Sequence, residues 1–227
     1  MVSIWWLLSV LGFLIAWGII YGLQACKNAN RADWGSILLN YLDGLNRIYC
    51  RKFHRLNPKL LPLPETGGVL IVANHISGLD PQLLISVSTR PLRFLIAREE
   101  YERRGFQWLF KGMKCIPVDR ETKPEKALKA ALLALQAGEV IALFPQGKIR
   151  LPSDSPAPLK KGAIWLATHT QVPIYPVHIK GVKGQGQVMG ALFQRSQVTL
   201  HHYDPIFSQS LSPDQCLAQI SQAIQGI

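Results

Sequence analysis

Residues 69–81 read VLIVANHISGLDP. The first five residues are apolar, lack the polar alternation of a half-buried strand and are too few for a helix, so they predict a strand buried on both faces. Asp80 and Pro81 are residue types that begin helices. The segment therefore predicts a strand, a polar loop and a helix in succession, as is typical of a parallel sheet.

The sequence on either side repeats this alternation. Short β-rich runs are expected at residues 92–97, 115–118, 140–144, 174–179 and 198–200, and helical stretches separate most of them. The most regular helical pattern covers residues 123–137 and stops at Gly138. We therefore expect an α/β domain over residues 66–227, with a mainly parallel sheet covered by helices on both faces.

The N-terminal segment predicts a membrane anchor at residues 1–25. This segment carries no charged side chain, and residues 4–23 are predominantly apolar. At about 1.5 Å rise per residue, such a helix crosses a hydrocarbon core of about 30 Å. Lys27 and Arg31 follow it while no basic residue precedes it, so the positive-inside rule puts the rest of the chain on the cytoplasmic side of the inner, or cytoplasmic, membrane.

Two alternatives for this segment stay open. A secretory signal would carry a basic residue before a shorter apolar run, and residues 23–26 (LQAC) only loosely resemble a cleavage box. A helix lying flat in the interface would keep its apolar residues on one face, whereas here they occur all round. Both features favour a spanning helix.

Residues 26–65 form a second predicted region, an amphipathic interfacial helix and a linker. An apolar stripe at helical spacing covers residues 32–56. It is accompanied by Arg47, Arg51, Lys52, His54 and Arg55. Such a helix suits an anionic membrane surface, and it equally suits packing on its own domain. Its position beside the anchor favours the membrane, and prolines at 58, 62 and 64 then end the helical pattern.

Composition excludes several classes of protein. The chain has 227 residues, of which 48% are hydrophobic and 17% charged, so it is too apolar to be disordered. Its net charge of +11 favours polyanionic partners such as nucleic acid, anionic lipid or phosphorylated substrates. The four cysteines form no Cys/His cluster, so we expect free thiols in a reducing compartment and no metal site.

His75 and Asp80 are the first candidates for chemistry. A carboxylate five residues after a histidine can orient one ring nitrogen, which leaves the other free to act as a base. This is a base and its orienting acid without an enzyme nucleophile, as suits a reaction in which the substrate's own hydroxyl attacks. In the structural alternative, Asp80 caps a helix and His75 makes an ordinary hydrogen bond.

Four sequence blocks in a fixed order extend this pattern. They are residues 74–80 (NHISGLD), 114–120 (KCIPVDR), 144–147 (FPQG) and 172–177 (VPIYPV). In type and order they resemble the blocks of the glycerolipid acyltransferase family, whose bacterial members include 1-acyl-glycerol-3-phosphate acyltransferases. Asn74 and Ser77 belong to the first block. The resemblance covers most of the predicted domain.

The resemblance implies a reaction and a role for several residues. His75 would be the general base that deprotonates the free hydroxyl of 1-acyl-glycerol-3-phosphate, Asp80 would orient it, and Arg120 would contact the acceptor phosphate. The hydroxyl would attack a fatty acyl thioester of CoA or acyl carrier protein, giving phosphatidic acid. The thioester is a co-substrate, and the resemblance implies no cofactor or metal.

The third block departs from the family pattern. The family usually has Glu followed by Gly-Thr-Arg, whereas this chain has Gln146, Gly147, Lys148 and Ile149. Lys148 and Arg150 flank the position of the missing Arg, so we expect Gln146, Gly147, Lys148 and Arg150 to bind the acceptor. The missing carboxylate makes a different lysolipid, such as a lyso-ornithine lipid, the alternative acceptor.

The basic stretch at residues 103–114 is interleaved with Phe106, Trp108 and Phe110. It suits either nucleic acid or a membrane surface, and the neighbouring anchor favours the membrane. We therefore expect membrane lipids, a lysophospholipid acceptor, and acyl-CoA or acyl carrier protein as partners, and no nucleic acid. A non-catalytic membrane-surface binding protein is the alternative from another class, and the oligomeric state stays open.

Overall fold

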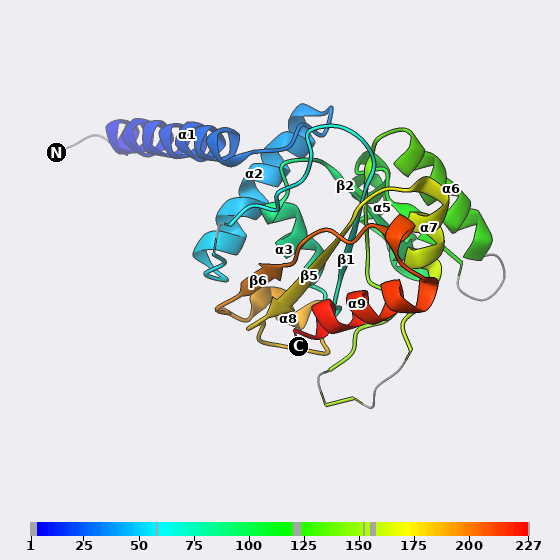
Figure 1. The fold of residues 1–227 in the computed structure, drawn as a ribbon. Coiled ribbons are helices and arrows are strands. Elements are labelled where there is room, and N and C mark those ends of the chain that lie inside the picture. The colour runs from blue at the N-terminus through cyan, green and yellow to red at the C-terminus, as the bar shows by residue number, and fades with distance from the viewer. Residues whose placement is uncertain (1–3, 58, 120–123, 152, 155–157, 227) are drawn as a thin grey trace.

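The computed structural model describes residues 4–57, 59–119, 124–151, 153–154 and 158–226. Within these residues, the strands form one sheet in the order β3-β2-β4-β1-β5-β6 (Figure 1). The strands are β1 (Val69–Ala73), β2 (Leu92–Ala97), β3 (Ile116–Val118), β4 (Val140–Leu143), β5 (Ile174–Lys180) and β6 (Thr199–His202). Every neighbouring pair is parallel except β5 and β6. The predicted mainly parallel sheet is confirmed.

Helices cover both faces of the sheet, as the continuous apolar pattern of β1 requires. Val69, Ile71 and Ala73 point to one core, which α2 (Ile37–Lys52) and α3 (Asp80–Val87) cover. Leu70 and Val72 point to the other core. That second core is covered by α6 (Pro124–Gln136), α7 (Gly162–Thr170) and α9 (Pro213–Gln225). Shorter elements are α4 (Arg98–Tyr101), α5 (Gln107–Gly112), α8 (Gly190–Phe193) and a 3₁₀ turn, Ser208–Ser210.

The N-terminal helix α1 (Ile4–Ala29) projects from the domain (Figure 1). It continues four residues beyond the predicted limit at residue 25, and none of its residues is buried. Its length and apolar composition are sufficient for it to cross a membrane. The end of α1 packs closely on α2, since an added Cβ on Gly44 of α2 would lie 1.8 Å from the Cys26 carbonyl oxygen.

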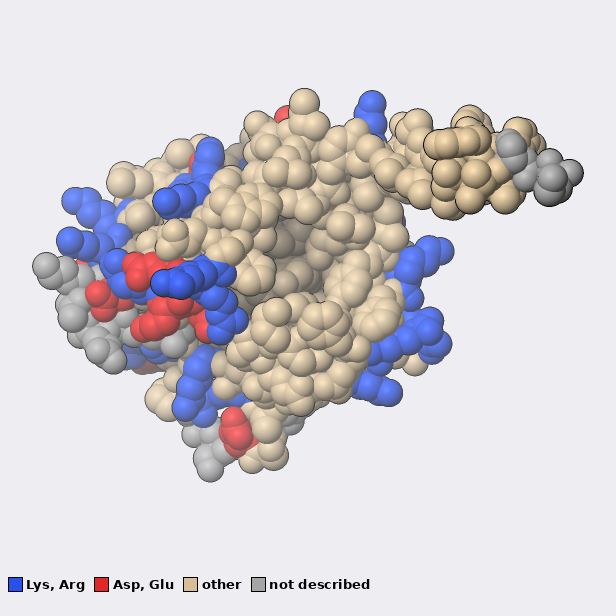
Figure 2. Space-filling view, turned by 180° about the vertical axis from the view of Figure 1, so that it is seen from behind, with Lys and Arg blue, Asp and Glu red and all other residues tan. Residues whose placement is uncertain are grey.

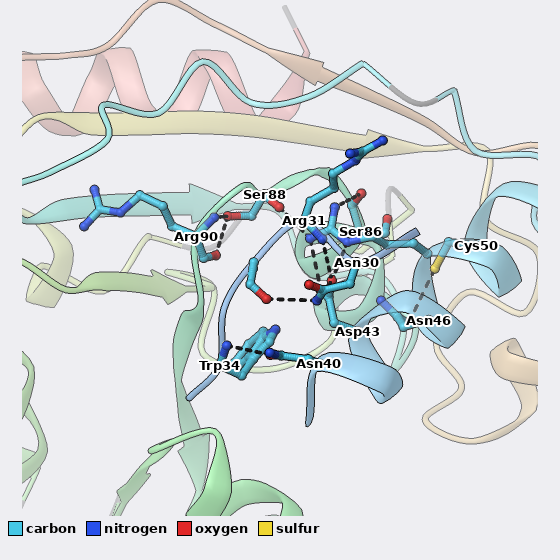
Figure 3. Close-up of polar contacts among 12 residues, drawn as sticks. Asn30, Arg31, Trp34, Asn40, Asp43, Asn46, Cys50, Ser86, Ser88 and Arg90 are labelled. Carbon is cyan, nitrogen blue, oxygen red and sulfur yellow. Dashed lines mark hydrogen bonds and ion pairs between the residues drawn. The ribbon is translucent and has the colours of Figure 1, made fainter. Parts of the chain in front are cut away.

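A buried ion pair joins the end of α1 to α2 and α3 (Figure 3). Asp43 Oδ2 accepts hydrogen bonds from Asn30 Nδ2 at 2.9 Å, from the Arg31 backbone N–H at 3.2 Å and from Arg47 Nε at 2.6 Å. The Arg47 guanidinium also donates to the carbonyl oxygens of Ser86 and Ser88, at 2.9 and 2.6 Å, just where α3 ends. The anchor helix is therefore tied to the C-terminal end of α3.

The structure corrects the prediction for residues 32–56. The helix covers only Ile37–Lys52, because residues before it are held in a turn in which the Trp34 N–H donates to Asn40 Oδ1 at 2.8 Å. Arg47 and His54 are fully buried, and burial lowers the pKa of His54, so neither belongs to a cationic membrane-facing surface. Lys52 and Arg55 are exposed, as are the apolar side chains of Ile37, Leu38 and Leu45. The helix packs on its own domain with one face and presents apolar groups on the other.

Candidate active site

The candidate site lies where parallel strands end together. Val72 of β1 is paired with Leu143 of β4, so the loops that follow these two strands begin side by side at the carboxyl edge of the sheet. The first loop carries Asn74 and His75 and the second carries Phe144 to Arg150. This edge is where open α/β sheets place their ligands.

Asn74 fixes the start of the first loop to the other neighbour of β1. Its Nδ2 donates to the Ile179 carbonyl oxygen at 2.9 Å, and its Oδ1 accepts from the Ile179 N–H at 2.7 Å. The side chain is buried, so both of its polar atoms need these partners. Asn74 thus fixes the start of this loop against β5.

Asp80 is a buried carboxylate at the first turn of α3. Its Oδ2 accepts from the backbone N–H groups of Ile76 at 2.7 Å and Ser77 at 2.9 Å, and its Oδ1 accepts from Ser77 Oγ at 2.7 Å. These backbone and hydroxyl donors satisfy the buried carboxylate oxygens. Ser77 thus holds the carboxylate in place, in agreement with its place in the first block.

The His75 ring completes this arrangement. Its Nδ1 lies 2.8 Å from Asp80 Oδ2, a contact that assigns the N–H of a neutral imidazole ring to Nδ1 and the lone pair to Nε2. The ring stacks on Phe144 with centroids 4.2 Å apart. The side chain is 20% exposed. The structure brings the predicted base and its orienting acid together in the geometry that general-base catalysis needs.

The third block supports the first from the neighbouring strand. Gln146 Oε1 accepts the hydrogen bond of the His75 backbone N–H at 2.5 Å, and the Arg150 N–H donates to the His75 carbonyl oxygen at 2.8 Å. A Glu at position 146 would offer the same kind of acceptor, so the departure from the family pattern preserves this contact. Gln146 thereby positions His75.

The remaining predicted acceptor-binding residues are placed differently. Arg120 lies outside the described residues. Lys148 is exposed and Arg150 is half-buried, and neither side chain lines the cavity beside His75. Gly147 does line that cavity, with a backbone φ of +73° that favours glycine.

Two adjoining cavities open near His75. One, of about 450 Å³, is lined by His75, Phe144 and Lys160, by residues at the end of β2 and by the start of α7. The other, of about 460 Å³, is a mainly apolar groove between α2, α3, α5 and β2. Phe94 and Ile96 of β2 line both. The two cavities therefore lie against the same part of β2, and the groove extends from there to α2.

The surface of the molecule also has a region of mostly uncharged residues. Viewed from behind, it is hollowed on a surface of mostly uncharged residues, with Lys and Arg side chains on either side and some Asp and Glu among them on one side (Figure 2). Phe106 and Trp108, at the start of α5, are 41% and 53% exposed. The basic and aromatic stretch predicted at residues 103–114 thus borders the apolar groove, which Leu109 and Phe110 line.

Neither Lys160 nor the stacking of His75 on Phe144 was predicted from the sequence. Lys160 precedes α7 and belongs to none of the four blocks, so no local pattern singles it out. Phe144 was predicted as the end of a strand and as part of the third block, but its contact with the His75 ring was not predicted. The described residues contain no cluster of His, Cys, Asp and Glu arranged to hold a metal ion.

The fold and the site together define an α/β domain that carries a His–Asp acid–base pair at the carboxyl edge of its sheet. The family model described as Acyltransferase matches residues 58–180, which include all four blocks. The chain belongs to this acyltransferase family.

Several relatives are named as 1-acyl-sn-glycerol-3-phosphate acyltransferases. A probable 1-acyl-sn-glycerol-3-phosphate acyltransferase of Mycoplasma pneumoniae is 35% identical over 63% of this chain and 54% of its own length. One of Mycoplasma genitalium is 31% identical over 70% of this chain and 60% of its own length. The 1-acyl-sn-glycerol-3-phosphate acyltransferase of Bacillus subtilis is 24% identical over 71% of this chain and 80% of its own length. The chain thus spans little more than half the length of the two Mycoplasma relatives.

A solved structure has the same fold. The crystal structure of the 1-acyl-sn-glycerophosphate acyltransferase PlsC from Thermotoga maritima aligns with a TM-score of 0.66 over 86% of this chain and 80% of that one. The sequences are 19% identical, so the likeness is one of fold.

Proposed function

We propose that this protein transfers a fatty acyl group from a thioester to the free hydroxyl of 1-acyl-glycerol-3-phosphate and so forms phosphatidic acid. The observation that carries the proposal is the hydrogen-bonded His75–Asp80 pair, because His75 lines a cavity that shares two wall residues of β2 with an apolar groove. The names of the relatives support the choice of acceptor.

The chemistry requires a base, an acceptor and a leaving group. His75 Nε2 takes the proton of the acceptor hydroxyl as the oxygen attacks the thioester carbonyl carbon. The carbon–oxygen bond forms, the carbon–sulfur bond breaks, and the proton on Nε2 passes to the departing thiolate. Asp80 stays ionised and stabilises the imidazolium that exists between these steps. Neither a metal nor a cofactor takes part, and the thioester is either acyl-CoA or acyl carrier protein.

The two cavities fit two different parts of the substrates. The groove between α2 and α5 has almost entirely apolar walls, which suit a fatty acyl chain, whereas the space beside His75 contains charged groups suited to a headgroup. We place α1 in the membrane and the exposed apolar side chains of α2 at its surface, with the domain on the cytoplasmic side. In that arrangement both substrates keep their chains near the bilayer.

The test is acyl transfer by membranes that contain the protein. Labelled acyl-CoA or acyl carrier protein is offered with lysophosphatidic acid, 1-acylglycerol and a lyso-ornithine lipid. We expect product from lysophosphatidic acid, and its loss in His75→Ala. The matched control is His201→Ala, which removes an exposed histidine of the edge strand β6, separated from β1 by β5.

Three other results would contradict the proposal. Product from the lyso-ornithine lipid alone would keep the mechanism and replace the acceptor. Product that persists in His75→Ala would refute the role of the base. No product with any acceptor or donor, from protein present and folded in the membrane, would favour a non-catalytic binding protein.

A further inference from the structure

A lysine outside the four sequence blocks lines the same cavity as His75. Lys160 lines the cavity of about 450 Å³ together with His75, Phe144 and Gly147. Among the Lys and Arg residues that the structure describes, it is the one that lines this cavity. Lys148 and Arg150, although close to His75 in the chain trace, are not part of its wall.

The third-block turn holds Lys160 in place. The Lys160 backbone N–H donates to the Pro145 carbonyl oxygen at 2.8 Å. Pro145 lies in the loop that follows β4. An added Cβ on Gly147 would lie 2.5 Å from Lys160 Cε and 3.0 Å from Nζ. The lysine arm therefore crosses the turn through space that exists because residue 147 is glycine. Its φ of +73° independently favours glycine at this position.

The charge of Lys160 is available to a ligand. Its ammonium group pairs with no carboxylate among the described residues. Glu100 also lines the cavity, but its Oε1 lies 3.4 Å from Arg103 Nη2. Lys160 is exposed to solvent, and its ammonium group, which lines a cavity with mostly apolar walls beside His75, can meet an anionic group that enters this cavity.

We propose that Lys160 binds the phosphate of the acceptor and supplies the positive charge that Ile149 cannot. This inference rests on the proposed function and deepens it, because it makes Lys160 a determinant of specificity for lysolipids with a phosphate monoester. It also gives Gly147 a physical role, which is to leave room for the lysine arm. A phosphate of CoA is the competing source of the same chemistry, and the experiment separates the two.

The experiment measures binding before turnover. Full-length protein in detergent is titrated with labelled 1-acyl-glycerol-3-phosphate and with labelled 1-acylglycerol, which lacks the phosphate. We expect Lys160→Met to weaken binding of the phosphorylated lipid by about tenfold or more and to leave binding of the neutral lipid unchanged. Lys160→Arg should retain most of the affinity. The matched control is Lys161→Met, because Lys161 is adjacent and exposed but does not line the cavity.

Kinetics then separate the acceptor from the donor. We expect Lys160→Met to raise KM for lysophosphatidic acid and to leave KM for acyl-CoA unchanged. A raised KM for acyl-CoA instead would assign Lys160 to the donor phosphates and overturn the proposal. Equal weakening of both lipids, or equal effects of Lys160→Met and Lys161→Met, would also overturn it.

Failure of the proposed function gives a different result. If the protein binds lysophosphatidic acid through Lys160 but no acyl transfer depends on His75, the binding data uphold the lysine site while the reaction is refuted. If wild-type protein binds the neutral lipid as tightly as the phosphorylated one, the lysine site is refuted whatever the activity.

Discussion

Asp80 and Asp43 are buried carboxylates near opposite ends of α3, yet their surroundings differ in kind. Asp80 lies at the first turn of the helix and holds His75, a titratable ring that borders a cavity. Asp43 holds Arg47, whose guanidinium is fully buried and caps the carbonyl oxygens of Ser86 and Ser88 at the last turn (Figure 3). We call the Asp80 end of α3, where His75 borders a cavity, the open end. We call the other end, where Asp43 and Arg47 are buried together, the sealed end.

The comparison shows how one chemical group serves two purposes. At the sealed end, every strong donor of the ion pair is matched within the protein, so the pair fixes the anchor helix to the domain and has nothing left to bind. At the open end, Asp80 is equally saturated, but its partner His75 retains one free nitrogen. Burial of a carboxylate therefore does not by itself mark a candidate site, whereas a partner that is 20% exposed and lines a cavity does.

The largest expected effect comes from Asp80→Asn. The amide oxygen can still accept from His75 and the backbone, and Ser77 Oγ can rotate to accept from the amide N–H₂, so the loop keeps its geometry. The neutral amide cannot stabilise the imidazolium. We expect acyl transfer to fall by about 10³-fold while the free energy of unfolding changes by about 1 kcal/mol or less. Transfer assays and urea unfolding in detergent check both values.

An aspartate-to-asparagine substitution at the sealed end should instead lower the stability of the protein and leave acyl transfer per folded molecule nearly unchanged. Asp43→Asn leaves the buried Arg47 without a counter-ion and sets an amide donor against the guanidinium. We expect the free energy of unfolding to fall by about 3–5 kcal/mol. At low temperature, transfer per folded molecule should stay near the wild-type value. Replacing both partners, in Asp43→Leu with Arg47→Met, should restore much of the lost stability; if it does not, the loss has another cause.

Alkaline pH should lower the free energy of unfolding through two buried cysteines. All four cysteines are free thiols, as expected. Burial raises the pKa of Cys50, next to Arg47 in α2, from 9.0 to about 12, and that of Cys115 to about 11. Because these pKa values are raised on folding, the stability that the neutral thiols provide is present below pH 9 and is lost as the pH rises towards 11 and 12.

The loss should be about 1.4 kcal/mol per thiol for each pH unit above the unfolded pKa. Urea midpoints at pH 8 and pH 10 measure it for the wild type and for Cys50→Ser. A pH dependence that is identical in the two proteins would mean that Cys50 ionises equally in the folded and unfolded states.

The smallest effect is expected from Gln146→Glu, which tests the support of the open end. The carboxylate still accepts from the His75 N–H, so transfer to lysophosphatidic acid should stay within about threefold of wild type. Gln146→Leu removes the acceptor and should lower kcat by about tenfold. A loss in the first variant as large as in the second would show that the amide group itself is needed.

The sequence by itself determined the features that depend on neighbours along the chain. The apolar run of β1, the Asp80–Pro81 helix start and the five-residue spacing of His75 and Asp80 all act over one strand, one loop and one turn. The apolar α1 is likewise a property of composition, and its end at Ala29 differs from the prediction by one turn. Local patterns are enough for these elements because the forces that form them are local.

Only the tertiary structure decided which charges are buried and which face the ligand. Arg47 has the same local pattern as its exposed neighbour Lys52, but it meets carbonyl oxygens about 40 residues further along the chain. Gln146 meets a backbone N–H that lies 71 residues away in sequence. Lys160 reaches the His75 cavity because Gly147 leaves its path free. A residue type fixes the charge that a side chain can carry, whereas packing between distant segments fixes the solvent and partners that charge meets.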